Sequence, residues 1–269
     1  AIWDAQAKAF DVEPVIDALV ADAEIAVDVE DTNALYDAYN SLCALVPNQL
    51  LDIAVNVYLA SGDIKYAEYC LEDAVYEIGY LPAETEGLAE LQAKAVEVEA
   101  AIASAYIELA LVAVETATDI ETLKNAIAGI DANLAEAKAD IFAMANGEAK
   151  DAVVAQYIAA QQAKLAKMEA VALEALAAAT TIDAVNAAES YKNDISAALT
   201  ALESDEIGVD TTAFAGTYEE ISVLAAEKVV SFAVAALGNA EDTDAVEAVA
   251  DIVAVAKAKL AALTASAEV

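Results

Sequence analysis

Chain-breaking residues are scarce in this sequence. Its 269 residues include only 8 glycines and 3 prolines, whereas 71 residues are alanine. An all-β fold needs many tight turns, which glycine and proline usually provide. Alanine has the highest intrinsic helix propensity, and its small side chain lets helices pack closely. The sequence therefore predicts an all-α fold of long helices joined by few loops.

An internal repeat indicates how these helices are arranged. The last two thirds of the chain align with themselves after shifts of 62 and then 61 residues. Apolar positions recur at spacings of 3 and 4, which places them on one helix face. We expect each copy to be a helical hairpin and consecutive hairpins to form elongated up-down bundles. The matched sets are Ala110, Ala172 and Ala233; Ala113, Ala175 and Ala236; Val114, Leu176 and Leu237; Ala117, Ala179 and Ala240; Glu121, Asp183 and Asp244; Leu123, Val185 and Val246; and Ala126, Ala188 and Val249.

Helix-start signals mark the turn in each copy. Side-chain oxygens of Ser, Thr, Asp or Asn satisfy backbone N–H groups that a new helix leaves unpaired. The pattern predicts caps over 118–121 and 180–183, and a third at Thr243 or over 244–247. Residues 83–269 are therefore interpreted as one domain of three hairpin repeats. Its expected helices span 85–116, 119–145, 148–178, 182–203, 217–237 and 243–265.

Residues 1–82 are predicted to form a separate helical bundle. Pro14 suits the first turn of a helix that runs to about residue 27, because proline is tolerated there. Pro47 is expected to open a new helix and Gly79 to close the last one. The further helices predicted in this domain span 32–46, 47–60 and 63–78.

The hairpin over 51–79 resembles a tetratricopeptide repeat. An aromatic residue, the turn and the small contacts of the second helix match that repeat. Its usual large aromatic residue and closing proline are replaced, and the hairpin is not repeated in tandem, so we interpret it as a convergent helical hairpin. The resemblance implies a fold suited to binding a peptide. The matching residues are Tyr58, Gly62-Asp63, Ala67, Leu71 and Ala74.

A broader resemblance concerns the style of the sequence. Segment 14–50 combines a short helix, an Ile25-Ala26-Val27 bridge and a tyrosine-containing run that starts at Asn33. This segment and the alanine-rich hairpins after residue 85 are similar to the helical-bundle repeats of bacterial surface-layer and cell-wall-associated proteins. That resemblance implies an extracellular structural role without catalysis, although the lack of arginine is unusual for that family.

The chain contains no histidine and no arginine, and its 48 acidic residues face 12 lysines, which leaves a formal net charge of −36. Histidine is the usual acid–base group at neutral pH, and arginine is the usual bidentate ligand of phosphates and carboxylates. The sequence therefore predicts no enzyme activity and no catalytic residues. Because acidic surfaces repel nucleic acids and anionic lipids, we expect protein partners or self-association and no nucleic-acid partner.

The sequence also bears on membranes and location. It has no run of about 18 consecutive apolar residues, so we predict no membrane insertion despite the positive mean hydropathy of +0.46. Salt and divalent cations screen the self-repulsion of so many carboxylates. We therefore expect an extracellular or cell-surface location.

Calcium is the cofactor best suited to a chain rich in carboxylates and without histidine, and no other cofactor is expected. Two acidic loops could hold it, but neither has EF-hand spacing, because no bidentate glutamate stands at the required position. Solvated loop carboxylates are the alternative interpretation. The candidate ligands are Asp28, Glu30 and Asp31 in one loop, and Glu203, Asp205 and Asp210 in the other.

Cys43 and Cys70 are the only cysteines, on helices expected to pack together. In a secreted chain they permit one disulfide. Such a bond would contribute on the order of 3 kcal/mol to stability by restricting the unfolded chain. The alternative is a pair of buried free thiols.

Tyrosines are concentrated in the first 80 residues. Tyrosine is favoured at protein interfaces, because it buries a ring while its hydroxyl stays hydrated. Partner contact is one interpretation, and filling a core that is short of large side chains is the other. The residues are Tyr36, Tyr39, Tyr58, Tyr66, Tyr69, Tyr76 and Tyr80.

These features favour a non-enzymatic, extracellular structural or assembly protein, such as a component of a surface layer, a filament or an adhesin stalk. One alternative is a helical-repeat module that binds a protein. Another is a designed helical protein, because regular caps and a skewed composition also suit design.

Overall fold

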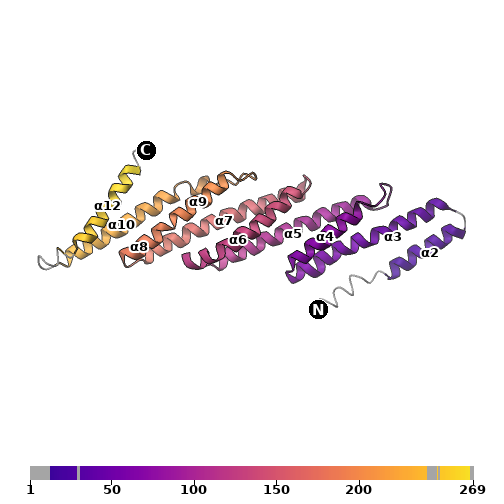
Figure 1. Cartoon of the computed structure of the whole chain (residues 1–269), viewed down its shortest axis with the longest axis horizontal. Helices are drawn as coiled ribbons and strands as arrows, with labels where there is room; N and C mark the ends of the chain where they lie inside the picture. Colours follow the sequence, from indigo (N-terminus) through magenta and orange to yellow (C-terminus); the bar gives the residue numbers. More distant parts are fainter. Residues whose placement is uncertain (1–12, 29–30, 241–246, 248, 267–269) are drawn as a thin grey trace. The chain divides into compact units, whose positions relative to one another are not determined.

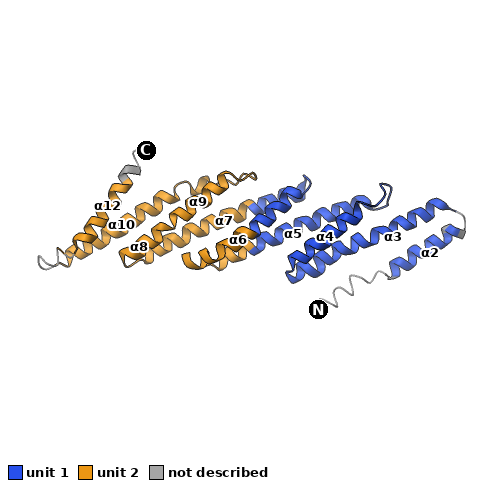
Figure 2. Cartoon of the chain, viewed as in Figure 1, with its two compact units in different colours: residues 1–109, 133–157 blue, residues 110–132, 158–269 orange. Residues whose placement is uncertain are grey.

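The structure is a computed structural model, and it describes residues 13–28, 31–240, 247 and 249–266. All regular secondary structure in these ranges is helical (Figure 1), so the prediction of an all-α fold is confirmed. The chain divides into two compact units (Figure 2). Unit 1 contains residues 1–109 and 133–157, and unit 2 contains residues 110–132 and 158–269.

The division between the units runs through three helices and does not fall at residue 82. These are α5 (Leu88–Thr116), α6 (Ile120–Ala143) and α7 (Glu148–Ala178). Each has 24 to 31 residues, which corresponds to roughly 36–46 Å of helix. Because the helices are so long, each contributes one end to each unit.

Unit 1 begins with α2 (Glu13–Asp28), α3 (Thr32–Ile53), the π-helical segment η1 (Ala54–Leu59) and α4 (Ile64–Ile78). Helix α2 packs against α3, and α3 with η1 packs against α4. Gly62 adopts a φ of 80° in the turn before α4, a conformation that glycine adopts without a steric penalty. The helical hairpin over 51–79 is thus present, and the interpretation that it only converges on the tetratricopeptide repeat stays a prediction.

Pro47 lies inside a helix, so the prediction that a new helix begins there is wrong. Helix α3 passes through Pro47 to Ile53, and η1 continues to Leu59. An internal proline removes one backbone donor and crowds the carbonyl four residues earlier. Pro47 is buried, and we attribute the continuity of the helix to this burial, which offsets the local cost.

Unit 2 contains α8 (Ile182–Ser190), α9 (Lys192–Glu203), the short 3-10 helix η2 (Thr212–Phe214), α10 (Thr217–Gly238) and α12 (Ala250–Ser266). Helix α10 packs against α8, α9 and α12. The single helix predicted over 182–203 is interrupted at Tyr191. The amide of Tyr191 donates to the carbonyl of Ala188, three residues back, and the Tyr191 ring is buried. The interruption of the helix thus coincides with a buried aromatic ring.

The repeat is visible as a pattern of burial. In the first two copies the positions of Val114 and Leu176 are buried, with 4% and 3% of the residue exposed. The equivalent Leu237 of the third copy is 44% exposed. The third predicted cap, at 243–244, lies outside the described residues. In the third copy Ala233 is buried like Ala110 and Ala172, so the repeat predicts this core position in all three copies and the position of Leu237 in the first two only.

Helix α6 is capped one residue later than predicted. The Asp119 carboxylate accepts a hydrogen bond from the Thr122 amide at 2.8 Å. In return, the Thr122 hydroxyl oxygen accepts from the Asp119 amide at 3.0 Å. This reciprocal pair is a capping box built from Asp119 and Thr122, in place of the expected box over 118–121.

Helix α8 shows the same shift. The hydroxyl of Thr181, and not that of Thr180, accepts from the Ala184 amide at 3.2 Å. The Thr181 carbonyl accepts from the amide of Val185, as the Asp119 carbonyl does from the amide of Leu123. Val185 and Leu123 are fully buried, so starting the helices here brings both side chains into the core.

Two helical stretches, Thr32–Leu59 and Thr212–Gly238, are long and apolar enough to cross a membrane. The core helix of a water-soluble bundle passes the same test of length and composition. In unit 2, α10 buries Ile221, Ala225 and Val229, as a core helix does. The expected lack of membrane insertion stays a prediction.

The cap assignment predicts a difference between two adjacent threonines. Thr181→Ala should lower the free energy of unfolding by about 1 kcal/mol, because the Ala184 amide loses its partner. Thr180→Ala is the matched control, and its effect should stay within about 0.5 kcal/mol, because Thr180 is exposed and does not cap α8. Urea denaturation followed by circular dichroism measures both values. A larger loss in Thr180→Ala would contradict the assignment.

Candidate functional site

Four strongly exposed tyrosines lie along α4 and the turn that follows it. Tyr66, Tyr69, Tyr76 and Tyr80 form a series with Asp73 at its centre, in steps of 3, 4, 3 and 4 residues. This spacing places the helical members on one face. The four tyrosines are between 54% and 70% exposed. These five residues are called the tyrosine stripe below.

The opposite face of α4 forms the core contact. Ile64, Ala67, Ala74 and Ile78 are buried, so small and branched side chains hold α4 in unit 1. The tyrosines thus form a second apolar face that the described helices leave exposed. Their presence is not explained by the packing of α4.

Ring contacts order the stripe. Tyr66 stacks on Tyr58 of η1, with ring centroids 5.3 Å apart, and meets Tyr69 edge-on at 6.0 Å. Tyr76 and Tyr80 meet edge-on at 4.9 Å, and the Tyr80 hydroxyl donates to the Tyr76 hydroxyl at 3.0 Å. Because such contacts restrict the rotamers in the free protein, less side-chain entropy is lost when a partner binds.

Exposure distinguishes the tyrosines of the first 80 residues from those of the core. Filling of a core describes Tyr106, Tyr157 and Tyr191, which are buried. It does not describe the seven tyrosines singled out in the first 80 residues, because Tyr58 is half-buried and the others are exposed. The exposed residues are Tyr36, Tyr39, Tyr66, Tyr69, Tyr76 and Tyr80.

Unit 1 also contains a polar cluster between α4, α5 and α6. The Tyr106 hydroxyl donates to Glu68 at 2.6 Å. Lys65 pairs with Glu68 at 3.0 Å and with Glu136 at 3.5 Å. The Lys65 ammonium also lies 5.4 Å from the centre of the Tyr106 ring. One lysine therefore joins two carboxylates and an aromatic ring from three helices.

Asp140 of α6 lies beside this cluster in an unfavourable environment for a charge. Burial raises the pKa of Asp140 to about 7, with further contributions from the negative charges of Glu68, Glu99 and Glu136, against an opposing effect of Lys65. Its Oδ2 atom is buried without a hydrogen-bond partner. The group is therefore tolerated when protonated and is destabilising when ionised.

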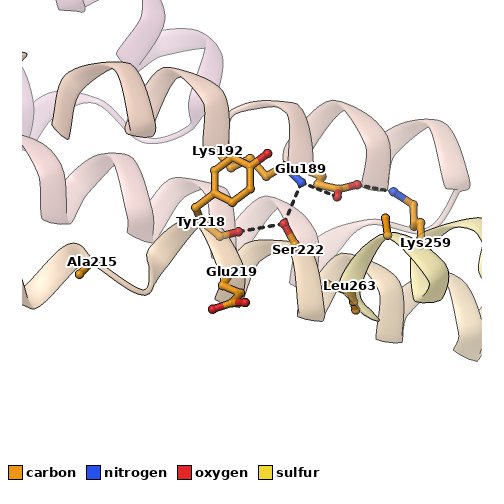
Figure 3. A pocket seen from close by; sticks show the side chains of 9 residues that line it. Glu189, Lys192, Ala215, Tyr218, Glu219, Ser222, Lys259 and Leu263 are labelled. Carbon is orange, nitrogen blue, oxygen red and sulfur yellow. Dashed lines mark hydrogen bonds and ion pairs between the residues drawn. The ribbon is translucent and has the colours of Figure 1, made fainter. Parts of the chain in front are cut away.

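A pocket of about 360 Å³ in unit 2 contains two lysines (Figure 3). Lys192 donates to Glu189 at 2.9 Å and to Ser222 at 2.7 Å, and its ammonium lies 4.7 Å from the centre of the Tyr218 ring. Lys259 of α12 pairs with the same Glu189. Burial alone would raise the pKa of Glu189, but hydrogen bonds from Lys259 and Lys192 hold it below its ordinary value. Glu189 of α8 thus binds lysines of α9 and α12, and Lys192 extends the contact to α10.

Lys192 and Ser222 lie at the distance found in Ser–Lys catalytic pairs. In such a pair a neutral amine takes the proton of the hydroxyl. Here the Lys192 ammonium is ion-paired with Glu189, and a charged ammonium cannot accept that proton. The geometry therefore suits a structural link between α9 and α10.

The first predicted calcium loop uses its described carboxylate as a helix cap. Asp31 accepts from the amides of Asn33 and Ala34, both at 3.1 Å, and so begins α3. The side chain of Asp28 and the whole of Glu30 lie outside the described residues.

The second predicted calcium loop stabilises its own backbone. Asp205 accepts from the Ile207 amide at 2.8 Å, and Asp210 accepts from the amide and hydroxyl of Thr212 at 3.0 and 2.7 Å. Glu203 is exposed at the end of α9. Among the described residues, no three His, Cys, Asp or Glu side chains are grouped as for one metal ion. Calcium binding at either loop stays a prediction.

Cys43 of α3 and Cys70 of α4 are half-buried free thiols on helices that pack together. Burial, with a smaller effect of Asp73, raises the pKa of the Cys70 thiol. A thiol that stays protonated is less reactive. Their oxidation to a disulfide stays a prediction, which the mass of the chain before and after reduction tests.

Comparison of the chain with protein-family models, with curated proteins and with solved structures finds no match. The resemblances to tetratricopeptide repeats and to surface-layer repeats therefore stay predictions. Any functional assignment rests on the residues of the chain itself.

The environment of Asp140 predicts a pH-dependent stability. Between its ordinary pKa of 3.8 and the folded value of about 7, the folded chain binds more protons than the unfolded chain. Stability contributed by this group is therefore lost as the pH rises through that window. Asp140→Asn should remove this loss and raise the free energy of unfolding at about pH 8. The gain should be on the order of 1 kcal/mol, because solvent screening of a half-buried group limits its size.

Urea denaturation of both chains across pH measures this difference. Glu108→Gln, at an exposed position in the middle of α5, is the control for loss of one negative charge. Wild type and Asp140→Asn curves that stay parallel from about pH 4 to 8 would contradict the assignment.

Proposed function

We propose that this chain is a non-enzymatic helical-hairpin scaffold that binds another protein through the tyrosine stripe. The observation that carries this proposal is the exposure of four tyrosines, between 54% and 70%, in one helical series. Tyrosine is among the residues that dominate binding energy at protein interfaces. The exposed stripe favours the binding alternative over the purely structural or assembly role expected from the sequence.

The size of the stripe suits a protein partner. A tyrosine buries about 150–250 Å² when fully covered, so covering these four would remove roughly 400–600 Å² from water. One side of a standard protein interface is about 800 Å². The stripe and its immediate neighbours would therefore supply most of one such side.

The absence of enzyme activity is part of the proposal. The sequence has no histidine, and Lys192, which donates a hydrogen bond to Ser222, is also ion-paired with Glu189. An extracellular or cell-surface location is proposed from the net charge of −36, because salt screens self-repulsion there.

An unbiased peptide-display library tests the stripe. Panning against the full chain should enrich peptides that bind the wild type and lose about tenfold or more in affinity for a chain carrying Tyr66→Ser, Tyr69→Ser and Tyr76→Ser. The three positions are exposed, so the fold should persist, which circular dichroism checks.

Phe142→Ser is the matched control, because Phe142 is an exposed aromatic residue on another helix of unit 1. It should leave the binding of the enriched peptides unchanged. Failure to enrich peptides whose binding depends on the three tyrosines would contradict the proposed function.

A further inference from the structure

We propose that the protein segment bound by the tyrosine stripe is basic, and that its lysines and arginines meet Asp73, Glu72 and Glu77 on α4. This inference rests on the proposed function of the stripe. It assigns the chemical class of the partner, which the exposure of the tyrosines alone leaves open.

The position of Asp73 favours a basic partner. It lies between Tyr69 and Tyr76 in the series, so a partner that covers the rings also covers this carboxylate. An ionised carboxylate that is taken out of water without a partner is strongly destabilising. A neutral apolar segment would leave Asp73 in that state, whereas a lysine or arginine would pair with it.

The surrounding charges point the same way. Glu72 and Glu77 are exposed beside Asp73 on α4, and within the described part of the chain no lysine pairs with any of the three. Lys65 is the single lysine of α4, and it is already engaged with Glu68 and Glu136. The positive charge that would complement this surface therefore has to come from the partner.

The same charges disfavour a second copy of the chain as the partner. Each copy has a net charge of −36, and two copies joined through the stripe would bring equivalent carboxylates together. Like charges opposite one another at an interface are unfavourable. A basic segment of another protein avoids this repulsion and is attracted over a longer range.

The rings themselves can receive cations. Among the described residues, five lysines lie 4.7 to 5.9 Å from the centres of aromatic rings, and the rings are those of Tyr106, Phe142, Tyr191, Tyr218 and Phe232. None of these rings belongs to the stripe. The exposed faces of the stripe tyrosines are therefore accessible to the lysines and arginines of a partner, with arginine the better match for stacking.

The length of the stripe sets the size of the probe. From Tyr66 to Tyr80 the chain advances 14 residues, or roughly 21 Å at the helical rise. A partner helix of about four turns would cover it. A synthetic peptide of about 20 residues therefore suffices to span the stripe.

The test measures the affinity of two labelled peptides for the full chain by fluorescence anisotropy. One peptide alternates Lys and Arg with Leu and Ser, and the other has Glu in place of every Lys and Arg. The basic peptide should bind, and the acidic peptide should not. Asp73→Asn, Glu72→Gln and Glu77→Gln together should weaken binding of the basic peptide roughly tenfold, as should the tyrosine triple variant.

A second set of neutralised carboxylates separates this site from general attraction to an acidic protein. Glu108→Gln, Glu115→Gln and Glu121→Gln remove the same charge at exposed positions on α5 and α6. This set should change the affinity by less than about threefold. Equal weakening by both sets, or no binding of the basic peptide, would overturn the inference.

The outcomes for the two proposals can be distinguished. Tyrosine-dependent peptides from the display library that are neutral or acidic would overturn the basic partner and leave the proposed function standing. Weakening of the basic peptide by the α4 carboxylate set but not by the tyrosine set would mean that the carboxylates bind it without the rings, and would overturn the basic partner of the stripe. Failure to enrich any tyrosine-dependent peptide from the library would overturn both proposals.

Discussion

The packing of these acidic helices depends on contacts made by a small number of lysines. Twelve lysines serve 48 carboxylates, and among the described residues seven lysines bind a group on another helix of their own unit. Alanine faces bury little area per residue, so these links help determine which faces meet. Lys164, Lys192 and Lys259 are well enclosed, with 8% to 15% of the side chain exposed. The seven are Lys65, Lys94, Lys124, Lys164, Lys192, Lys228 and Lys259.

The placement of the lysines has a consequence for the surface. Cations that lie between helices are not available to neutralise exposed carboxylates such as Asp73. On α4 this leaves a face where ordered tyrosine rings alternate with uncompensated negative charge, while the opposite face packs through Ala67 and Ala74. Aromatic rings are usually buried, whereas these rings are exposed at regular spacing. Such departures from the usual burial of apolar groups are expected at functional sites. The same scarcity leaves the half-buried Asp140 among like charges.

Local sequence signals predicted the helices but not every boundary. Alanine content and the 3–4 periodicity predicted the all-α fold, and the helix predicted over 148–178 coincides with α7. The observed caps lie one residue after the predicted ones. Adjacent residues such as Thr180 and Thr181 can both cap a helix, and we attribute the choice between them to packing of Val185 in the core. Packing also overrode the propensity of Pro47. The stripe was visible as a tyrosine excess, and the spacing of Ile64, Ala67, Ala74 and Ile78 could have shown which face of α4 is buried. The environment of Asp140 has no local signal, because it is formed by three helices.

The rate at which each lysine is acetylated in the native chain tests most directly whether the lysines are committed to links between helices. A small acylating reagent and peptide mass spectrometry, after cleavage at acidic residues, resolve the individual sites. We predict that Lys164, Lys192 and Lys259 react several-fold more slowly than Lys257, which is exposed and only two residues from Lys259. Equal rates at Lys257 and at these three lysines would contradict this prediction.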